Sequence, residues 1–256
     1  MRNTTLTAIC VLISVGAAPA DWSSGDPHKM HHPQLPDPNG WDVRITNSRR
    51  ELTEPLEWVV ADDWKCSSSG PVTDVHFWVS RMQEVEDTIE NVHLSIHSDI
   101  PAGTGGETYS RPADPPRWQR DFGPNDFTMV DAGTGDQGWF DPPFDDWNED
   151  DHQKFYQINI VDIPDPFEQV EGTIYWLDIS VDLRGEAETG QLGWKTSTDH
   201  FNDDAVYWDM IDQKWVELRD PINNESLDMA FVITPEPATM MLLAIGGLVV
   251  LRRRRR

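Results

Sequence analysis

The stretch Val72-Thr73-Asp74-Val75-His76-Phe77-Trp78-Val79-Ser80 decides the fold, because apolar side chains alternate in it with other types. A strand points successive side chains to opposite faces, so a period of two predicts a strand with one face inward and one outward. The stretch 89–97 repeats the pattern, with Val92, Leu94 and Ile96 on one face and His93, Ser95 and His97 on the other. Such alternation fits antiparallel strands with one solvated face.

Further strands are predicted on both sides of these two, with turn-rich joints between them. They cover 41–45, 56–64, 155–163, 172–183, 192–196, 205–209, 215–218 and 226–233. No amphipathic segment long enough for a helix interrupts them. The pattern therefore predicts an all-β protein, an antiparallel β-sandwich of jelly-roll type in one domain at 41–234.

The middle of the chain, residues 99–151, has a different composition. Pro, Gly and Asp dominate it, and Trp and Phe are scattered among them. Only 126–130 has a weak strand pattern. A flexible linker would not carry so many aromatic residues, so we expect long ordered loops that the aromatics pin to the domain.

The first residues predict export. Met1-Arg2 supplies a positive charge, 6–15 are mostly apolar, and Ala18-Pro19-Ala20 has the small-x-small form of a cleavage site. This order is typical of a secretory signal peptide at 1–20, which an extended lead-in at 21–40 would follow. Cys10 falls in the signal, so Cys66 is the only cysteine left and no intrachain disulfide can form.

The chain is strongly acidic, with 20 Lys and Arg against 45 Asp and Glu. Removing both ends leaves 14 basic and 44 acidic residues, a net charge of −30. Phosphates would be repelled, which excludes a nucleic-acid partner. Two interpretations stay open for the carboxylates: a solvated acidic surface, or a site for a divalent cation such as calcium.

The densest acidic stretch is 141–151, which offers the candidate calcium ligands Asp145, Asp146, Glu149, Asp150 and Asp151. It lacks the spacing of an EF-hand loop, and we expect no cofactor other than this calcium. A second acidic group comprises Asp199, Asp203 and Asp204. Asp favours hydrogen-bonded turns, so this group is interpreted as turn chemistry.

No catalytic motif is present, and we expect a protein that is not an enzyme. Cys66 has no histidine beside it in sequence. A secreted hydrolase stays open, because with so many carboxylates some pair would always have the separation that glycoside hydrolysis needs.

A carbohydrate-binding module also stays open. Trp22, Trp118, Trp139 and Trp147 lie in expected loops, where they either stack on sugars or anchor the loops; Trp58, Trp78, Trp176 and Trp208 lie in expected strands and are interpreted as core or sheet-face residues.

The last residues form three blocks in order. Pro235-Glu236-Pro237 comes first, then an apolar run at 240–251, then Arg252, Arg253, Arg254, Arg255 and Arg256. This end resembles the PEP-CTERM sorting signal of exosortase-containing Gram-negative bacteria. The resemblance implies export, arrest in the inner membrane by a short transmembrane helix, and cleavage near the Pro-Glu-Pro motif by an exosortase. A helix over 238–251 spans only about 21 Å, short of the roughly 30 Å hydrocarbon core, which suits a transient anchor.

The body resembles a domain that is joined to such tails in planctomycete-type bacteria. That domain has no assigned activity, so the resemblance implies no catalytic function. The resemblance lies in Ala61-Asp62-Asp63-Trp64-Lys65-Cys66, Val75-His76-Phe77-Trp78, Gly193-Trp194-Lys195-Thr196-Ser197 and 226–233. We therefore predict a surface or matrix protein, of the kind found in biofilms, with a structural or adhesive role. Its predicted partners are an exosortase, the inner membrane for a time, and extracellular polysaccharide.

Overall fold

The computed structural model of the protein describes residues 21–47, 57–184 and 190–235. The predicted signal peptide, the predicted transmembrane segment, Glu236, Pro237 and the five terminal arginines lie outside these ranges. Among the described residues, no helix is both long enough and apolar enough to cross a membrane.

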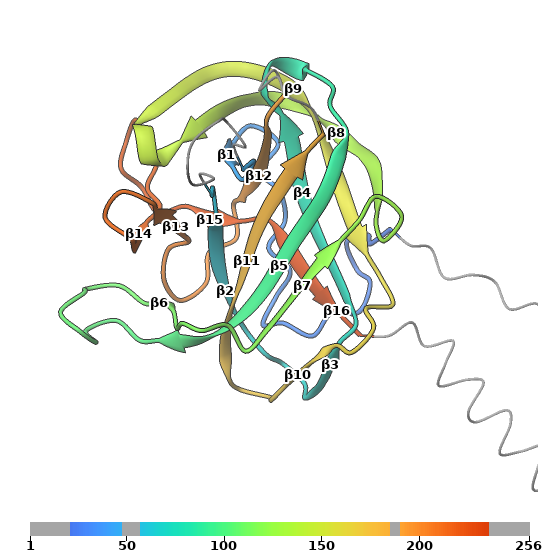
Figure 1. Ribbon diagram of the computed structural model, residues 1–256, viewed down its shortest axis with the longest axis vertical. Coiled ribbons are helices and arrows are strands. Elements are labelled where there is room, and N and C mark those ends of the chain that lie inside the picture. Colours follow the sequence, from blue (N-terminus) through green and yellow to red (C-terminus); the bar gives the residue numbers. More distant parts are fainter. Residues whose placement is uncertain (1–20, 48–56, 185–189, 236–256) are drawn as a thin grey trace, which may run out of the picture. The chain divides into compact units, whose positions relative to one another are not determined.

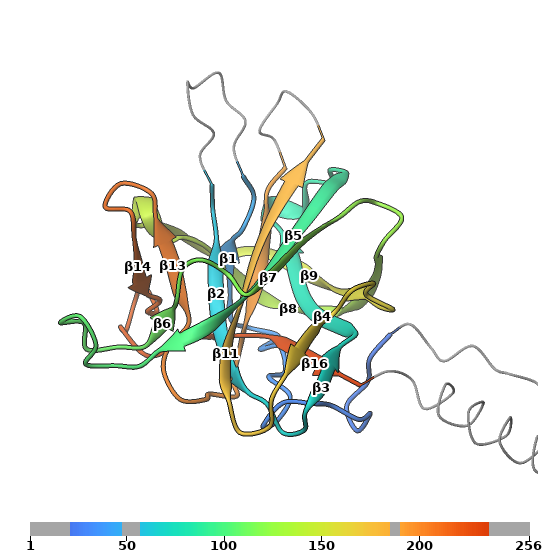
Figure 2. The same ribbon diagram turned by 60° about the horizontal axis from the view of Figure 1, so that its bottom comes forward.

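The described chain forms two large sheets and one small one (Figures 1 and 2). The first sheet has the order β15 (Asp228–Met229), β12 (Leu192–Ser197), β1 (Trp41–Arg44), β8 (Thr128–Asp141), β9 (Asp146–Ile160), β4 (Asp74–Arg81) and β16 (Phe231–Thr234). The second has the order β14 (Lys214–Glu217), β13 (Val206–Asp209), β2 (Val60–Lys65), β11 (Ile174–Leu183), β5 (Ile89–Ile100) and β6 (Arg111–Pro112), with β7 (Trp118–Phe122) also paired to β5. The small sheet pairs β10 (Phe167–Gln169) with β3 (Gly70–Val72), and the two 3-10 turns are η1 (Met82–Glu84) and η2 (Pro142–Phe144).

The prediction of an all-β fold is confirmed. The core lies between the two large sheets, where the apolar sides of their central strands meet. Val75, Phe77 and Val79 of β4 and Val92, Leu94 and Ile96 of β5 are fully buried in one cluster. Burial of each such side chain contributes roughly 1.5–3 kcal/mol, so the period-two pattern of these strands is the main reason that the sheets face each other.

The first sheet curls back on itself. Strand β12 pairs with β1 along one edge and with β4 along the other, which closes a ring of five strands, β12-β1-β8-β9-β4. Within the ring, β1 runs parallel to β8, where we expected antiparallel pairing throughout. Parallel neighbours need a long connection, and here the whole chain from β2 to β7 separates the two strands.

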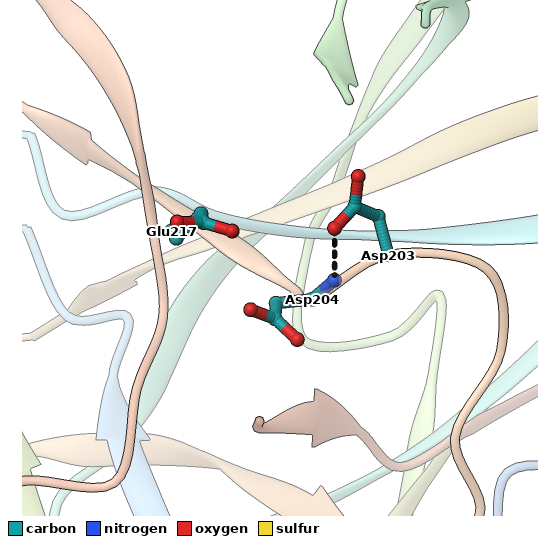
Figure 3. A group of neighbouring side chains, drawn as sticks. All are labelled: Asp203, Asp204 and Glu217. Carbon is teal, nitrogen blue, oxygen red and sulfur yellow. Dashed lines mark hydrogen bonds between the residues drawn. The ribbon is translucent and has the colours of Figure 1, made fainter. Parts of the chain in front are cut away.

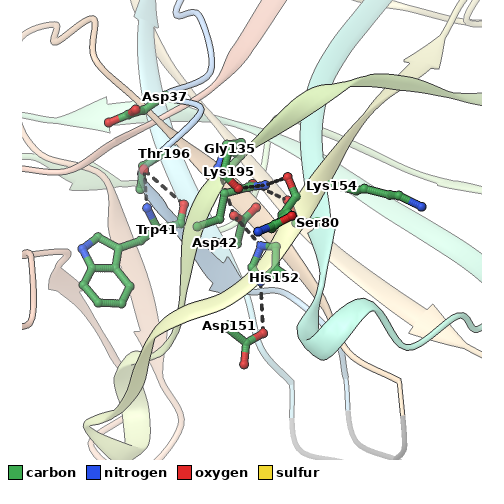
Figure 4. A network of polar contacts seen from close by, with 12 residues as sticks. Asp37, Trp41, Asp42, Ser80, Gly135, Asp151, His152, Lys154, Lys195 and Thr196 are labelled. Atoms are coloured by element: carbon green, nitrogen blue, oxygen red, sulfur yellow. Dashed lines mark hydrogen bonds and ion pairs between the residues drawn. The ribbon is translucent and has the colours of Figure 1, made fainter.

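All five strands of the ring carry buried polar side chains. Among them are Asp42, Ser80, Gln137, His152 and Lys195. Asp42 Oδ2 accepts hydrogen bonds from Lys195 Nζ at 3.1 Å and from His152 Nε2 at 3.0 Å (Figure 4). Ser80 Oγ donates to Gln137 Oε1 at 2.9 Å. The inside of the ring is therefore a hydrogen-bonded charge network, which we call the ring network.

The charges of the ring network follow from its geometry. Burial alone would raise the pKa of Asp42, but the Lys195 charge and the His152 hydrogen bond outweigh it and lower that pKa. Burial alone would lower the pKa of His152, but hydrogen bonds to Asp151 and Asp42 raise it to about 9. His152 Nδ1 lies 3.0 Å from Asp151 Oδ1, so both ring nitrogens donate to carboxylates and the side chain is an imidazolium.

The expectation of a solvated face was wrong for β4, because both of its faces are buried. Ser80 lies inside the ring, and Trp78 is covered by the lead-in, where Trp22 packs edge-on against it at a centroid distance of 6.1 Å. The lead-in forms isolated bridges from Met30 to Cys66 and from Gln34 to Phe231. The lead-in consists of turns, bends and these isolated bridges, and it covers one face of the domain.

The expectation of loops over 99–151 holds for 101–110 and 113–117, but it was wrong for most of 118–151, where β7, β8 and the first part of β9 lie. Strands β8 and β9 form a long hairpin whose far end, at η2, lies beside β13 (Figure 1). The register shifts at three places in β8, between 131 and 133, 134 and 137, and 137 and 139. The first two shifts each insert one extra residue in β8, and the third inserts two in β9. Such bulges reset the alternation, which is why no period of two is visible there. A Cβ on Gly135 would overlap the carbonyl oxygen of Pro38, so glycine in this strand marks a close backbone approach.

The ring network gives a first prediction for stability. Lys195→Met leaves Asp42 buried with only His152 as its cation, and breaking a buried pair costs about 3–5 kcal/mol. We expect urea unfolding to show a loss of that size. The matched control is Lys154→Met, because Lys154 is exposed and we expect it to change stability by no more than about 0.5 kcal/mol. Equal losses in the two variants would contradict the role of the network.

The His152 imidazolium gives a second prediction, for pH. Its pKa is raised from 6.5 to about 9 on folding, so its stabilisation is complete below pH 6.5 and is lost as the pH rises through about 9. The shift corresponds to roughly 3 kcal/mol. We expect the unfolding free energy to fall over this range, and His152→Gln to reduce the slope. An unchanged slope in that variant would show that other groups cause the dependence.

Candidate functional site: a groove on the second sheet

A groove of about 560 Å³ lies on the face of the second sheet that points away from the core. Its floor is the polar side of β5 and β11, and its described lining also includes residues of β7, β13 and β14. His93 pairs across the strands with Asp121 and Ser180, and Ser95 pairs with Gln119 and Asp178. Neighbouring strands lie about 4.8 Å apart, so the floor presents rows of hydrogen-bonding side chains at short, regular spacing.

The deepest part of the floor is a buried cluster of Ser95, His97 and Asp178. Ser95 Oγ donates to Asp178 Oδ1 at 2.6 Å, and His97 Nε2 lies 2.7 Å from Asp178 Oδ2. His97 Nδ1 lies 2.9 Å from the carbonyl oxygen of Ala113. A carbonyl only accepts, so Nδ1 carries a proton, and Nε2 donates to the carboxylate. Burial alone would lower the pKa of His97, but Asp178 outweighs it and raises that pKa.

This cluster is not arranged as a catalytic triad. In a triad, the acid holds one ring nitrogen of the histidine and the serine meets the other. Here Asp178 and Ser95 both approach Nε2, at 2.7 and 3.2 Å, and the serine proton goes to the carboxylate. A histidine with both nitrogens protonated has no lone pair with which to activate Ser95. The cluster therefore fixes the floor and presents polar atoms.

Two tryptophans form one wall of the groove. Trp208 and Trp215 are directly opposite each other on β13 and β14, with their rings edge to face at a centroid distance of 5.4 Å. Trp215 is buried and also packs edge-on against His97, whereas Trp208 is half-buried. Strand β13 joins the sheet through β2, so the hairpin holds both rings at the groove.

The rim of the groove is acidic. Asp121 is exposed and accepts hydrogen bonds from His93 at 2.8 Å and from Asn91 at 3.1 Å, which together lower its pKa. Asp182 accepts one from Asn47 at 3.2 Å. Asp114 and Glu57 are further carboxylates of the lining. The described lining contains two histidines and no Lys or Arg.

The four tryptophans that we placed in loops do not line this groove. Trp118, Trp139 and Trp147 lie in β7, β8 and β9. Trp22 and Trp139 are buried, Trp118 donates from Nε1 to the carbonyl oxygen of Asp165 at 2.9 Å, and Trp147 is exposed. Trp22, Trp118 and Trp139 therefore pack against neighbouring segments, whereas Trp147 has an exposed ring. Of the four placed in strands, Trp58, Trp78 and Trp176 are buried, and Trp208 is the one that reaches the groove.

The acidic stretch 141–151 lies around the end of the β8–β9 hairpin. Asp145, Asp146, Glu149 and Asp150 are exposed there. Asp151 is held by the ring network and also accepts a hydrogen bond from the backbone nitrogen of Gln83 at 2.7 Å. Calcium at these residues stays a prediction, which a melting temperature measured with and without a chelator would test.

Within the described part of the chain, one group of carboxylates converges closely enough to hold an ion. It comprises Asp203, Asp204 and Glu217, with ligand oxygens within 4.8 Å of one another (Figure 3). Arg219 Nη2 lies 2.5 Å from Asp204 Oδ2 and 3.0 Å from Glu217 Oε1, so a guanidinium already offsets two of the charges. The backbone nitrogen of Asp204 donates to Asp203 Oδ1 at 3.2 Å. This bond joins adjacent residues, and the backbone at 203–204 is not a hydrogen-bonded turn.

Cys66 is buried, and burial raises the pKa of its thiol. Its Sγ donates to the carbonyl oxygen of Ser68 at 3.2 Å. A buried thiol with a raised pKa is a poor nucleophile, so its environment fits a structural role.

The sequence contains one signal for the groove, a row of polar residues along each of two strands. His93, Ser95 and His97 on β5 and Asp178, Ser180 and Asp182 on β11 are polar at every second position. Alternation of this kind predicts a solvated surface. The hairpin with Trp208 and Trp215 turns that surface into a groove, and nothing in the local pattern predicts where a hairpin more than 100 residues away from β5 will pack.

The stretches that carry the family resemblance meet in the fold. Asp62 Oδ2 accepts hydrogen bonds from the backbone nitrogen of Met229 at 2.6 Å and from Gln34 Nε2 at 2.7 Å. Burial and the nearby charge of Asp228 raise the pKa of Asp62 well above its ordinary value. Trp194 Nε1 donates to the carbonyl oxygen of Ala230 at 2.8 Å. These polar residues therefore join the two sheets and the lead-in, rather than forming a site at the surface.

Two family models match the chain. The domain of unknown function DUF7901 matches residues 30–234, and the PEP-CTERM protein-sorting motif matches residues 234–256. A search of the curated proteins and a search of the solved structures found no match. The first model covers most of the chain, and the second covers the three terminal blocks in order. The chain is therefore a PEP-CTERM-type protein that belongs to the DUF7901 family.

Proposed function

We propose that this exported protein binds polysaccharide of the cell surface or matrix in the groove of the second sheet, without catalysis. The PEP-CTERM signal implies export and processing by an exosortase, a membrane protein. The observation that carries the proposal is the pairing of an indole wall, Trp208 and Trp215, with a floor of hydrogen-bonding side chains. Sugars present both kinds of surface, an apolar ring face and a rim of hydroxyl groups.

The floor suits a hydroxyl-rich ligand because its groups are already fixed. Ser95, His97 and Asp178 hold one another through three contacts of 2.6–3.2 Å. A preorganised site loses little conformational entropy when a ligand binds. The polar rows of the floor follow neighbouring strands, so a chain of sugars would meet hydrogen-bonding groups at regular spacing.

The same contacts weigh against the alternative of a hydrolase. Both ring nitrogens of His97 are taken up by contacts with Asp178 and the carbonyl oxygen of Ala113, so neither is free to act as a base. The lowered pKa of Asp121 keeps that carboxyl ionised at neutral pH rather than ready to donate a proton. An adhesive role requires only binding. The protein would hold matrix polysaccharide at the surface to which its sorting signal directs it.

The proposal predicts that Trp208→Ala weakens binding at least tenfold, or about 1.4 kcal/mol, because it removes a half-buried indole from the groove wall. Affinity electrophoresis in gels that contain neutral, acidic or amino-sugar polysaccharides would measure the change. The comparison variant is Trp147→Ala, which removes an exposed indole that does not line the groove. A larger loss in Trp147→Ala would move the binding surface to the β8–β9 hairpin.

The sorting signal gives a prediction of its own. We expect the mature protein to end near Pro237, because the exosortase removes the apolar run and the arginines. Intact-mass spectrometry of the protein released from its native host would measure this end. A mass that includes Arg256 would contradict the expected cleavage.

A further inference from the structure

The groove carries more negative charge than the side chains of its described lining can offset. Four carboxylates line it besides Asp182: Glu57, Asp114, Asp121 and Asp178. The two histidines of the described lining can neutralise at most two of them, through the contacts His97–Asp178 at 2.7 Å and His93–Asp121 at 2.8 Å. The described lining therefore stays net negative in every protonation state of its histidines.

This excess charge restricts what can cover the groove. A ligand that lies over the rim removes water from Asp114 and Asp121, which is costly unless the ligand supplies opposite charge. A neutral sugar chain supplies hydroxyl groups but no charge. A chain of uronic acids adds like charge and is repelled, the more so because the whole body is acidic.

The two tryptophans of the groove wall also favour a cationic ligand. Ammonium groups bind to the faces of tryptophan rings through cation–π attraction, and tryptophan is the strongest of the aromatic side chains in this respect. Trp208 and Trp215 lie edge to face, so their faces point in different directions beside the carboxylates. Carboxylates and indole faces around one pocket are the surroundings that an organic cation prefers.

We propose that the groove selects a polysaccharide that bears primary ammonium groups, that is, a polymer of amino sugars with free amines. This inference rests on the proposed function and names the class of its ligand. The carboxylates of the rim pair with ammonium groups along the chain, the oxygen atoms of Ser95 and Asp178 in the floor accept hydrogen bonds from its hydroxyl groups, and the indoles contact the sugar faces.

The test uses three hexasaccharides of the same length near pH 6, where free amines are protonated. They are a hexamer of glucosamine, a hexamer of N-acetylglucosamine and a hexamer of galacturonic acid, titrated into the mature protein and followed by calorimetry. We expect the glucosamine hexamer to bind at least about tenfold more tightly than the N-acetylated one, and the galacturonate not to bind. Salt should weaken the first interaction, because it screens charge pairs.

An acidic protein attracts any polycation, so a pair of variants must locate the binding. Asp114 and Asp121 have largely exposed side chains, so Asp114→Asn with Asp121→Asn should leave the fold intact. This double variant should bind the glucosamine hexamer about three- to tenfold more weakly, because two partly exposed ion pairs are lost. The control, Glu168→Gln with Glu171→Gln, removes the same charge from exposed residues outside the groove lining. It should change the affinity by less than about twofold.

The outcomes separate this inference from the function on which it rests. If the glucosamine and N-acetylglucosamine hexamers bind equally, and both are lost in Trp208→Ala, the groove binds sugars but does not select ammonium. If the two double variants weaken binding equally, the attraction is to the overall charge and the inference fails. If the three hexamers and the polysaccharide gels all show no binding, the proposed function fails with it.

Discussion

Strand β12 is shared between two edges of one sheet, and the rest of the structure depends on how that sharing is stabilised. It pairs with β1 on one side and β4 on the other, which forces five strands into a ring. The inside of the ring holds buried polar side chains rather than part of the sheet-to-sheet core, with Asp42, His152 and Lys195 at its centre. Two cations on one carboxylate leave no uncompensated negative charge at its centre, which is the condition under which buried charges are tolerated.

Closing the ring has consequences for the second sheet. The apolar sides of β4 and β12 face the core, where Phe77 and Trp194 pack edge to face at 6.4 Å, and β5 and β11 complete that core from the other side. Because the core holds the apolar sides of β5 and β11, their polar sides must face outward. The hairpin β13–β14 and the segment around Ala113 then border that outward face, and the groove results.

Much of this arrangement follows from local patterns in the sequence. The alternation in 72–80 and 89–97 predicted two core strands, and both are core strands. The same alternation was interpreted as a core side and a solvated side, and on β4 this failed because Trp22 covers Trp78 from a segment with no periodicity of its own. Strand β8 and the first part of β9 were missed for a different reason. The register shifts between the two strands interrupt the alternation, and Gly135, at which the lead-in approaches the backbone closely, has no side chain to contribute to it.

By itself, the sequence determined the class of fold, the acidic character of the chain, and the sorting motif at its end, because each depends on residue type and order alone. Only the tertiary structure decided which polar residues act together. Asp42, His152 and Lys195 lie far apart in the chain, as do Ser95, Asp178 and Trp208, and each looks like a solvated or sheet-face residue where it stands. Their roles arise from strand pairing between distant segments, and a local pattern carries no information about which distant strand will supply the partner.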